Sequence, residues 1–240
     1  MPLDWPPRQA AHLAAFPSEP TAGRTFYRAW RFALADGTTR DGPWWFGSVP
    51  DPPDAGGRYD LPAPMGTCYT ATRPAGAVLE SLQALLTNLP TAELRARRLA
   101  VIPTPPDTPP AAKLTARAGA GRYGVTAALW AGVDRQRTQA WAAAFRRDGW
   151  WALYGGIHHD PSGRLRGVAL FDHAGQHPPT FGGDWSHTTR TLHDDPDLID
   201  ELAAFGIHVR EPGDLPVADL PVANLPVAEL PGTDPPNQQV

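Results

Sequence analysis

The stretch from Gly56 to Leu82 constrains the fold more than any other part of the chain, because it prescribes a loop, a strand and a helix in immediate succession. Its two opening glycines allow positive φ angles and let the backbone approach a neighbouring group closely. Residues 67–72 then have the composition of a short strand. Pro74 begins a helix at an early position, where its missing N–H is not needed. Side chains from these three elements can meet in one pocket.

Three side chains of this stretch are candidates for that pocket. Arg58 follows the glycine pair and is suited to clamp an anion, because a guanidinium forms paired hydrogen bonds with phosphate. Tyr69 lies in the strand. Glu80 lies just off the apolar face of the helix with only small residues one turn away, so its carboxylate would stand beside open space. On these patterns alone, an ordinary turn around Arg58 and a solvated glutamate remain the commoner outcomes.

Further elements are predicted along the chain from its hydrophobic periodicity. The helix that begins at Pro74 has an apolar face formed by Val78, Leu82, Leu85 and Leu89. The other predicted elements are strands at 26–32, 98–102 and 167–171 and helices at 125–130, 134–147 and 196–205.

Arg28 lies in the predicted strand at 26–32, in which aromatic and basic residues alternate. If the aromatic residues face the core, Arg28 shares their side and is a buried cation that needs a carboxylate or a ligand phosphate as its partner. If the segment is a twisted edge strand, Arg28 lies in water. The sequence favours neither alternative.

Composition and charge argue against several classes of protein. The 240-residue chain has a net charge of −4, which does not favour binding to duplex nucleic acid or to an anionic membrane. No stretch approaches the roughly 18 apolar residues that span a bilayer, and the first residues lack a signal-peptide pattern. The single cysteine, Cys68, excludes an intrachain disulfide framework and suits a reducing compartment. We therefore expect a cytoplasmic protein without nucleic-acid or membrane partners.

The two ends of the chain differ in composition from its middle. Residues 1–24 are rich in Pro, Ala and charged residues and are expected to form an N-terminal extension on the surface. Residues 176–211 are expected to form a C-terminal extension with one helix. The chain at 212–240 repeats Leu-Pro-Val-Ala with a polar residue, and a proline at every fifth position prevents helices and sheet ladders. This repeat is predicted to be a disordered tail.

His158, His159 and Asp160 form a run of side chains that can bind metals. Adjacent side chains on an extended loop point to opposite sides, and the sequence offers no evident third ligand. We therefore expect no metal site.

An ordered series of short motifs resembles the RES domain family, which is named for arginine, glutamate and serine residues and is best known from the toxins of Xre–RES toxin–antitoxin modules. The series is Tyr27-Arg28, Gly56-Gly57-Arg58-Tyr59, Tyr69-Thr70-Ala71, Ala77-Val78-Leu79-Glu80, Thr138-Gln139-Ala140-Trp141-Ala142, Asp160-Pro161 and Val168-Ala169-Leu170-Phe171. No single motif is specific, but their order is. The resemblance covers about residues 25–175, which we take as the domain.

The resemblance implies an α+β fold like that of ADP-ribosyltransferases, in which a mixed, split sheet with flanking helices surrounds an NAD cleft. It also implies that the protein consumes NAD by breaking the nicotinamide–ribose bond, through hydrolysis or phosphorolysis. The candidate catalytic residues are then Glu80, Arg58, Tyr69 and Ser162, and the candidate NAD-binding residues are Tyr27, Arg28, Arg58 and Tyr69.

The residue types suit that chemistry. Arg28 and Arg58 match the pyrophosphate of NAD, and Tyr69 or a nearby tryptophan can face its flat, cationic nicotinamide. Cleavage builds oxocarbenium-like positive charge on the ribose, which the carboxylate of Glu80 would stabilise as carboxylates do in glycoside hydrolysis. The leaving nicotinamide already carries a positive charge, so no general acid is needed.

The serine of the family pattern has no clear counterpart here. In the family, a run Gly-Ile-x-Tyr-x-Ser precedes an Arg-x-Asp-Pro turn. Alignment on Asp160-Pro161 puts Ile157 at the serine position. Alignment on Gly156-Ile157 puts Pro161 there instead. Ser162, one place beyond, is either the family serine or a turn residue.

Two other functions stay open. The first is transfer of ADP-ribose to a protein target. The second is a RES module that binds a nucleotide or a partner without chemistry, which the displaced serine favours. The resemblance also implies an Xre-type antitoxin as a candidate partner.

Overall fold

An eight-stranded mixed sheet forms the centre of the computed structural model, which describes residues 3–9, 12–32, 39–82, 87–160 and 162–211. The repeat at 212–240 lies outside the described residues. Across the sheet, the strands are β1 (Ser18–Glu19), β6 (Ala111–Lys113), β7 (Ala152–Gly156), β8 (Arg166–His173), β3 (Met65–Ala71), β2 (Thr25–Arg31), β5 (Arg97–Pro103) and β9 (Thr188–Thr191). Strands β6 and β7 are parallel, and the other neighbours are antiparallel.

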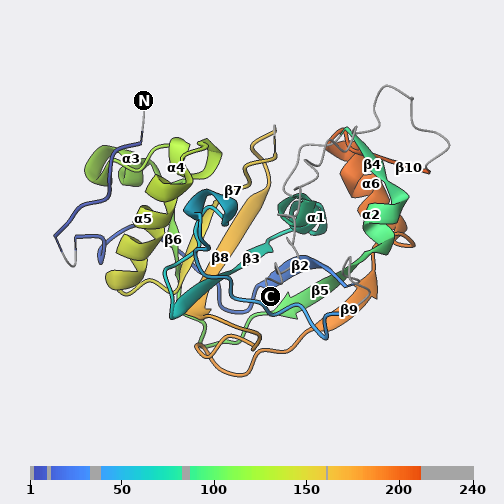
Figure 1. Ribbon diagram of the computed structural model, residues 1–240, viewed down its shortest axis with the longest axis horizontal. Helices are drawn as coiled ribbons and strands as arrows, with labels where there is room; N and C mark the ends of the chain where they lie inside the picture. Colours follow the sequence, from blue (N-terminus) through green and yellow to red (C-terminus); the bar gives the residue numbers. More distant parts are fainter. Residues whose placement is uncertain (1–2, 10–11, 33–38, 83–86, 161, 212–240) are drawn as a thin grey trace, which may run out of the picture.

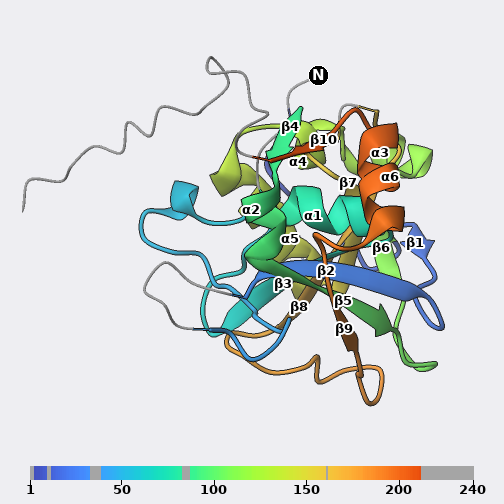
Figure 2. The ribbon, with the colours of Figure 1, turned by 90° about the vertical axis from the view of Figure 1, so that its right-hand side faces the viewer.

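The helices cover this sheet in groups (Figures 1 and 2). They are α1 (Pro74–Leu82), α2 (Thr91–Arg95), α3 (Arg117–Tyr123), α4 (Ala128–Ala131), α5 (Arg135–Arg147) and α6 (Pro196–Ala204), with a 3-10 turn η1 (Pro53–Ala55). In Figure 1, α3, α4 and α5 lie at one end, α2 and α6 at the other, and α1 between them. A small parallel sheet of β4 (Asn88–Pro90) and β10 (His208–Arg210) accompanies α2 and α6. The predicted α+β class, a mixed sheet with flanking helices, is confirmed.

Two of the predicted helix starts are confirmed by their capping contacts. The side chain of Asp134 accepts a hydrogen bond from the backbone N–H of Arg137 at 2.9 Å, and that of Asp195 accepts one from Leu198 at 3.1 Å. Each cap satisfies an N–H that has no partner within the helix. Among the described helices, none is both long and apolar enough to cross a membrane.

The helix predicted to run from Pro74 to Leu89 is shorter than expected. Its described part is Pro74–Leu82, and Leu89 is instead fully buried in β4. Leu85 and Leu86 lie outside the described residues. The apolar spacing was misleading because a buried residue of a short strand can continue the spacing of the preceding helix.

The two extensions complete the sheet. Leu13 and Phe16 of the N-terminal extension are buried, and the Phe16 ring packs edge-on against Phe145 of α5 with centroids 4.9 Å apart. Their burial differs from the expected surface location. Strands β1 and β9, from the two extensions, are the outermost strands. Short strands at both edges limit the exposure of unpaired backbone groups.

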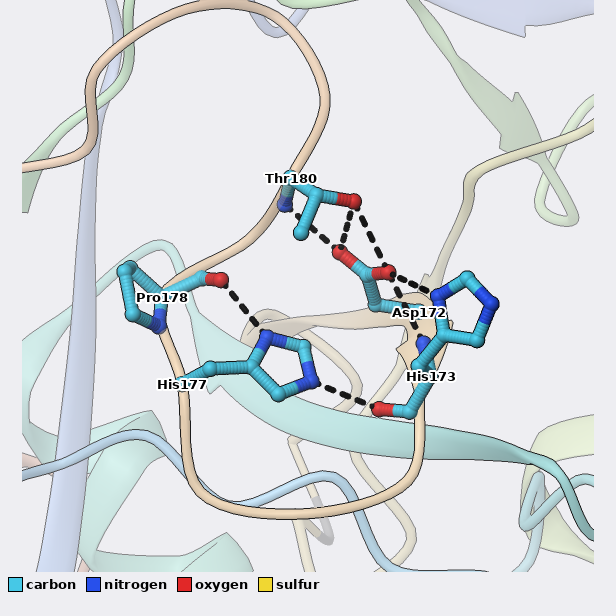
Figure 3. A network of polar contacts seen from close by, with 5 residues as sticks. All are labelled: Asp172, His173, His177, Pro178 and Thr180. Atoms are coloured by element: carbon cyan, nitrogen blue, oxygen red, sulfur yellow. Dashed lines mark hydrogen bonds and ion pairs between the residues drawn. The ribbon is translucent and has the colours of Figure 1, made fainter.

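A buried carboxylate holds the loop between β8 and β9 (Figure 3). Asp172 is fully buried and accepts hydrogen bonds from the backbone N–H of His173 at 2.8 Å and that of Thr180 at 2.6 Å. In the same loop, the ring of His177 stacks on Phe46 at 5.0 Å between centroids. These contacts hold the loop between β8 and β9 against the core.

Candidate active site

The sheet opens between β2 and β3. Strands β2 and β3 pair only at Tyr27 and Ala71. In contrast, β2 pairs with β5 along its whole length, and β3 pairs with β8 along its whole length. Beyond that point Arg28 bridges the opening: its Nη1 donates to the carbonyl of Tyr69 at 2.9 Å and to Sγ of Cys68 at 2.8 Å. The sheet is therefore split at its centre, as the resemblance implies.

A cavity of about 280 Å³ lies at this opening. Its volume is close to the lower end of the range for small-molecule sites, about 300–1,000 Å³. The predicted residues that line it are Arg28, Arg58, Tyr69 and Glu80. Tyr27 packs in the core against α1 instead, and neither Tyr27 nor Ser162 is among the lining residues.

Glu80 presents an unpaired carboxylate to the cavity. It forms no hydrogen bond or salt bridge with the described residues, and Gly167 gives it room, since a Cβ there would lie 3.0 Å from its Oε1. Burial raises the pKa of Glu80 to about 7, against the opposing effect of the nearby charges of Arg58 and Arg135. A partly buried carboxylate without a partner is costly in the folded protein, so it is suited to receive a cationic ligand.

The glycine pair is needed for close approach. A Cβ on Gly57 would lie 2.4 Å from the hydroxyl of Tyr69, and neither glycine of the pair has a positive φ. That hydroxyl donates to Asp60 at 2.9 Å and accepts from the backbone N–H of Tyr59 at 2.8 Å. Tyr69 thus fixes the loop that carries Arg58, in addition to lining the cavity.

Arg58 is buried, and one of its two terminal guanidinium nitrogens forms no hydrogen bond. Only 7% of the residue is exposed, its Nη1 donates to the carbonyl of Gly132, and its buried Nη2 has no hydrogen-bond partner. Burial lowers the pKa of Arg58, yet an arginine stays protonated in proteins. The cavity therefore holds a cation with a free donor, which is what an anionic ligand requires.

Arg28 lies on the core side of β2, as in the first of the two alternatives, but it is half-buried and not fully enclosed. Phe26 and Trp30 are buried on the same side, and Arg28 finds carbonyl and sulfur partners in place of a carboxylate. Its buried Nε has no hydrogen-bond partner. Its Nη1 thus joins the two halves of the sheet, while Nη2 donates to the carbonyl of Trp45 at 3.5 Å.

His158 and His159 also line the cavity, with their rings edge-on at 4.6 Å between centroids. Burial, with repulsion from Arg58 and Arg135, lowers the pKa of both rings, that of His158 to about 4. Both imidazoles are therefore neutral near pH 7. Among the described residues, no group of three or more His, Cys, Asp or Glu side chains could hold a metal ion.

Sequence reasoning missed several basic residues of the cavity: Arg31, Arg40, Arg97 and Arg135. Arg135 is the first residue of α5. A positive charge at a helix N-terminus opposes the helix dipole, and that local conflict was a signal of another role. The remaining three lie in or near strands, where basic residues usually face water.

A family model decides how the chain is classified: the model of the RES domain matches residues 25–193. The chain belongs to the RES domain family. Among solved structures, the M. tuberculosis MbcT–MbcA toxin–antitoxin complex contains a chain similar to this RES protein, with 20% sequence identity and a TM-score of 0.50. The match covers 79% of this chain and 91% of that one. No curated protein matches the sequence.

That likeness supports the fold, consistent with an ADP-ribosyltransferase-like arrangement of the split sheet. The RES model extends past residue 175 to 193, and β9 at its end pairs with β5 in the central sheet. The C-terminal extension therefore contributes to the same sheet as the rest of the domain.

Ser162 lies in a turn of this RES protein, exposed to solvent. Its hydroxyl donates to Asp160 at 2.5 Å and accepts from the backbone N–H of Arg164 at 3.2 Å. Burial would raise the pKa of Asp160, but hydrogen bonds from Ser162 and from the backbone N–H of Leu165 outweigh it and lower the pKa. These contacts favour the interpretation of Ser162 as a turn residue.

Alignment on Asp160-Pro161 places Ile157 at the serine position of the family pattern. It is buried, and a Cβ on Gly167 would lie 3.4 Å from its Cγ1 and 3.0 Å from Oε1 of Glu80. The position therefore adjoins the candidate carboxylate, and an apolar side chain fills it.

Ser162→Ala should leave the rate of nicotinamide release nearly unchanged while lowering stability by less than about 1 kcal/mol, because only a turn contact is lost. Steady-state kinetics and thermal melting of the variant check this. A hundredfold loss of rate with an unchanged melting temperature would show that Ser162 is catalytic.

Proposed function

We propose that this RES protein consumes NAD by breaking the bond between nicotinamide and ribose C1′, with Glu80 as the stabilising carboxylate. The observation that carries the proposal is the presence, in one cavity, of an unpaired carboxylate on Glu80 and an unpartnered cationic nitrogen on Arg58. The carboxylate is suited to the charge that develops on the ribose. The guanidinium is suited to the pyrophosphate.

In the proposed step, the C1′–N bond breaks and its electron pair stays with nicotinamide, which becomes neutral. An oxygen of water or of orthophosphate then bonds to C1′; when water is the nucleophile, one of its protons is released to solvent. Glu80 stabilises the positive ribose without giving up a proton. The Tyr69 ring, which lines the same cavity, is placed to contact the flat nicotinamide cation.

The proposal is tested by incubating the purified full-length protein with NAD and measuring nicotinamide release with and without orthophosphate. Hydrolysis yields ADP-ribose in either condition. Phosphorolysis requires orthophosphate and yields a phosphorylated ADP-ribose. Transfer to a protein yields nicotinamide only when a protein acceptor is added. No release under any of these conditions would contradict the proposal.

A toxic role restrained by an antitoxin is the corresponding proposal for the cell. It is supported by the family and by the similar structure, which is of a toxin–antitoxin complex. A cytoplasmic location would suit the single cysteine, which is buried and free. Induced expression in bacteria should then slow growth with the wild-type chain and not with Glu80→Gln.

Binding without chemistry is the second candidate function. The observations that favour it are that Ser162 is engaged with Asp160 and that Ile157 fills the alternative serine position. Under this alternative the protein binds NAD but releases no nicotinamide, so the release assay and a binding measurement distinguish the two.

The rate of nicotinamide release should decrease at acidic pH, because a single group, the Glu80 carboxylate, takes up a proton. Glu80 has a raised pKa of about 7 and must be ionised to stabilise the ribose, so activity is present above that value and lost below it. Between pH 8 and pH 6, kcat/KM for NAD should decrease about tenfold. His158 is already neutral there, with its pKa lowered to about 4. A flat profile over this range would show that Glu80 does not control the rate.

A further inference from the structure

One wall of the cavity carries a pair of arginines that the proposed reaction does not use. Arg31 is the last residue of β2 and Arg97 is the first of β5, and the two are partners in the strand register. Both line the cavity that contains Glu80. Only 5% of Arg97 is exposed, so its charge lies almost entirely within the protein.

The two arginines share a single carboxylate. Nη2 of Arg31 and Nη1 of Arg97 both contact Oε2 of Glu93, the former at 2.8 Å. Nε of Arg97 donates to the hydroxyl of Ser81 at 2.8 Å, and its Nη1 also donates to the backbone carbonyl of Glu93 at 2.9 Å. Two cations therefore face one anion. An excess positive charge is left at the cavity wall.

This pair is separate from the arginine assigned to the pyrophosphate. Arg58 comes from the loop after η1, whereas Arg31 and Arg97 come from adjoining strands of the sheet. Ser81, which holds Arg97, follows Glu80 in α1. The residue that holds Arg97 is therefore the neighbour of the candidate carboxylate in sequence.

We propose that Arg31 and Arg97 bind a phosphate group other than the pyrophosphate of the dinucleotide. Guanidinium groups form paired, charge-assisted hydrogen bonds with phosphate oxygens, and a dianionic phosphate would offset the excess charge. Two sources can supply it: the 2′-phosphate of NADP, or free orthophosphate. The inference rests on the proposed function for the identity of the dinucleotide.

The test measures binding, so it does not depend on turnover. Isothermal titration calorimetry would follow NAD, NADP and orthophosphate binding to the full-length chain carrying Glu80→Gln, alone and combined with Arg31→Gln. Arg98→Gln is the matched control, because Arg98 neighbours Arg97 in β5, stacks on the ring of Phe32 and does not line the cavity. Melting temperatures verify that each variant is folded.

We expect Arg31→Gln to weaken binding of a phosphate source about tenfold or more, with no effect of Arg98→Gln. If the source is the 2′-phosphate, NADP binds more tightly than NAD and Arg31→Gln removes the difference. If it is orthophosphate, only orthophosphate binding is lost. The inference would be overturned if adding Arg31→Gln left the affinities for NADP and orthophosphate unchanged. It would also be overturned if neither NADP nor orthophosphate bound at all. An equal loss for NAD and NADP, with orthophosphate unaffected, would also overturn it. Absence of nicotinamide release from the wild-type chain would count only against the proposed function.

Discussion

Glu80→Gln is expected to abolish nicotinamide release from NAD while the protein stays folded. Glutamine keeps the shape of the side chain beside Gly167 but carries no charge, so it cannot stabilise positive charge on the ribose. The carboxylate has no hydrogen bond or salt bridge to lose among the described residues. Loss of activity would therefore report on chemistry. The measurement is single-turnover nicotinamide release at pH 8, where the wild-type carboxylate is ionised.

The same substitution should stabilise the protein in mild alkali. Burial raises the pKa of Glu80 to about 7 from its ordinary value of 4.5, so the folded chain holds this proton more tightly than the unfolded chain. The contribution of protonated Glu80 to the free energy of unfolding is fully present below pH 4.5 and is lost as the pH rises through 7. Glutamine does not ionise, so the variant should have the higher melting temperature at pH 8 and lose that advantage at pH 4.5.

Glu201→Gln is the matched control for both effects. Glu201 in α6 accepts a hydrogen bond from the backbone N–H of Ala75 at 3.1 Å and pairs with Arg73, outside the cavity. Its loss should lower stability and leave nicotinamide release intact. If Glu80→Gln releases nicotinamide at the wild-type rate, Glu80 is a helix residue without a catalytic role.

The part of the site that follows from the sequence is the part that is local in it. Arg58, Tyr69 and Glu80 lie on a loop, a strand and a helix that succeed one another within one stretch, so their meeting required only that these three elements form. Arg97 and Arg135 reach the same cavity from elements far along the chain. Their approach depends on how β5 and α5 pack, which hydrophobic periodicity does not specify.

The fold shows a similar division. Strands β2, β3, β5 and β8 form where their buried residues alternate or run together, and α5 and α6 begin next to Asp134 and Asp195, which cap them. Helix α3 was missed because its sequence, Arg-Ala-Gly-Ala-Gly-Arg-Tyr, has two glycines and little apolar periodicity. The burial of Leu13 and Phe16 was missed for a related reason: isolated apolar residues among prolines and charges give no periodic signal.

Arg58→Ala should weaken NAD binding by about tenfold to a hundredfold, since a charge-assisted phosphate contact is worth roughly 1.5–3 kcal/mol. It should also lower stability, because the carbonyl of Gly132 loses its donor. Arg137→Ala separates the two effects. Arg137 likewise donates its Nη1 to a backbone carbonyl, that of Leu3, but does not line the cavity. Calorimetric NAD titrations and melting temperatures of both variants make the comparison.

A role for Arg58 in the site has a second signature that a structural arginine would not give. Its charge is the first of the two that oppose the raised pKa of Glu80. Without it, the pKa of Glu80 should rise further, so any residual activity of Arg58→Ala should need a higher pH than that of the wild type. Arg137→Ala should leave the profile in place. If the two variants bind NAD equally well and show the same pH profile, Arg58 only supports the loop and the anion site lies elsewhere.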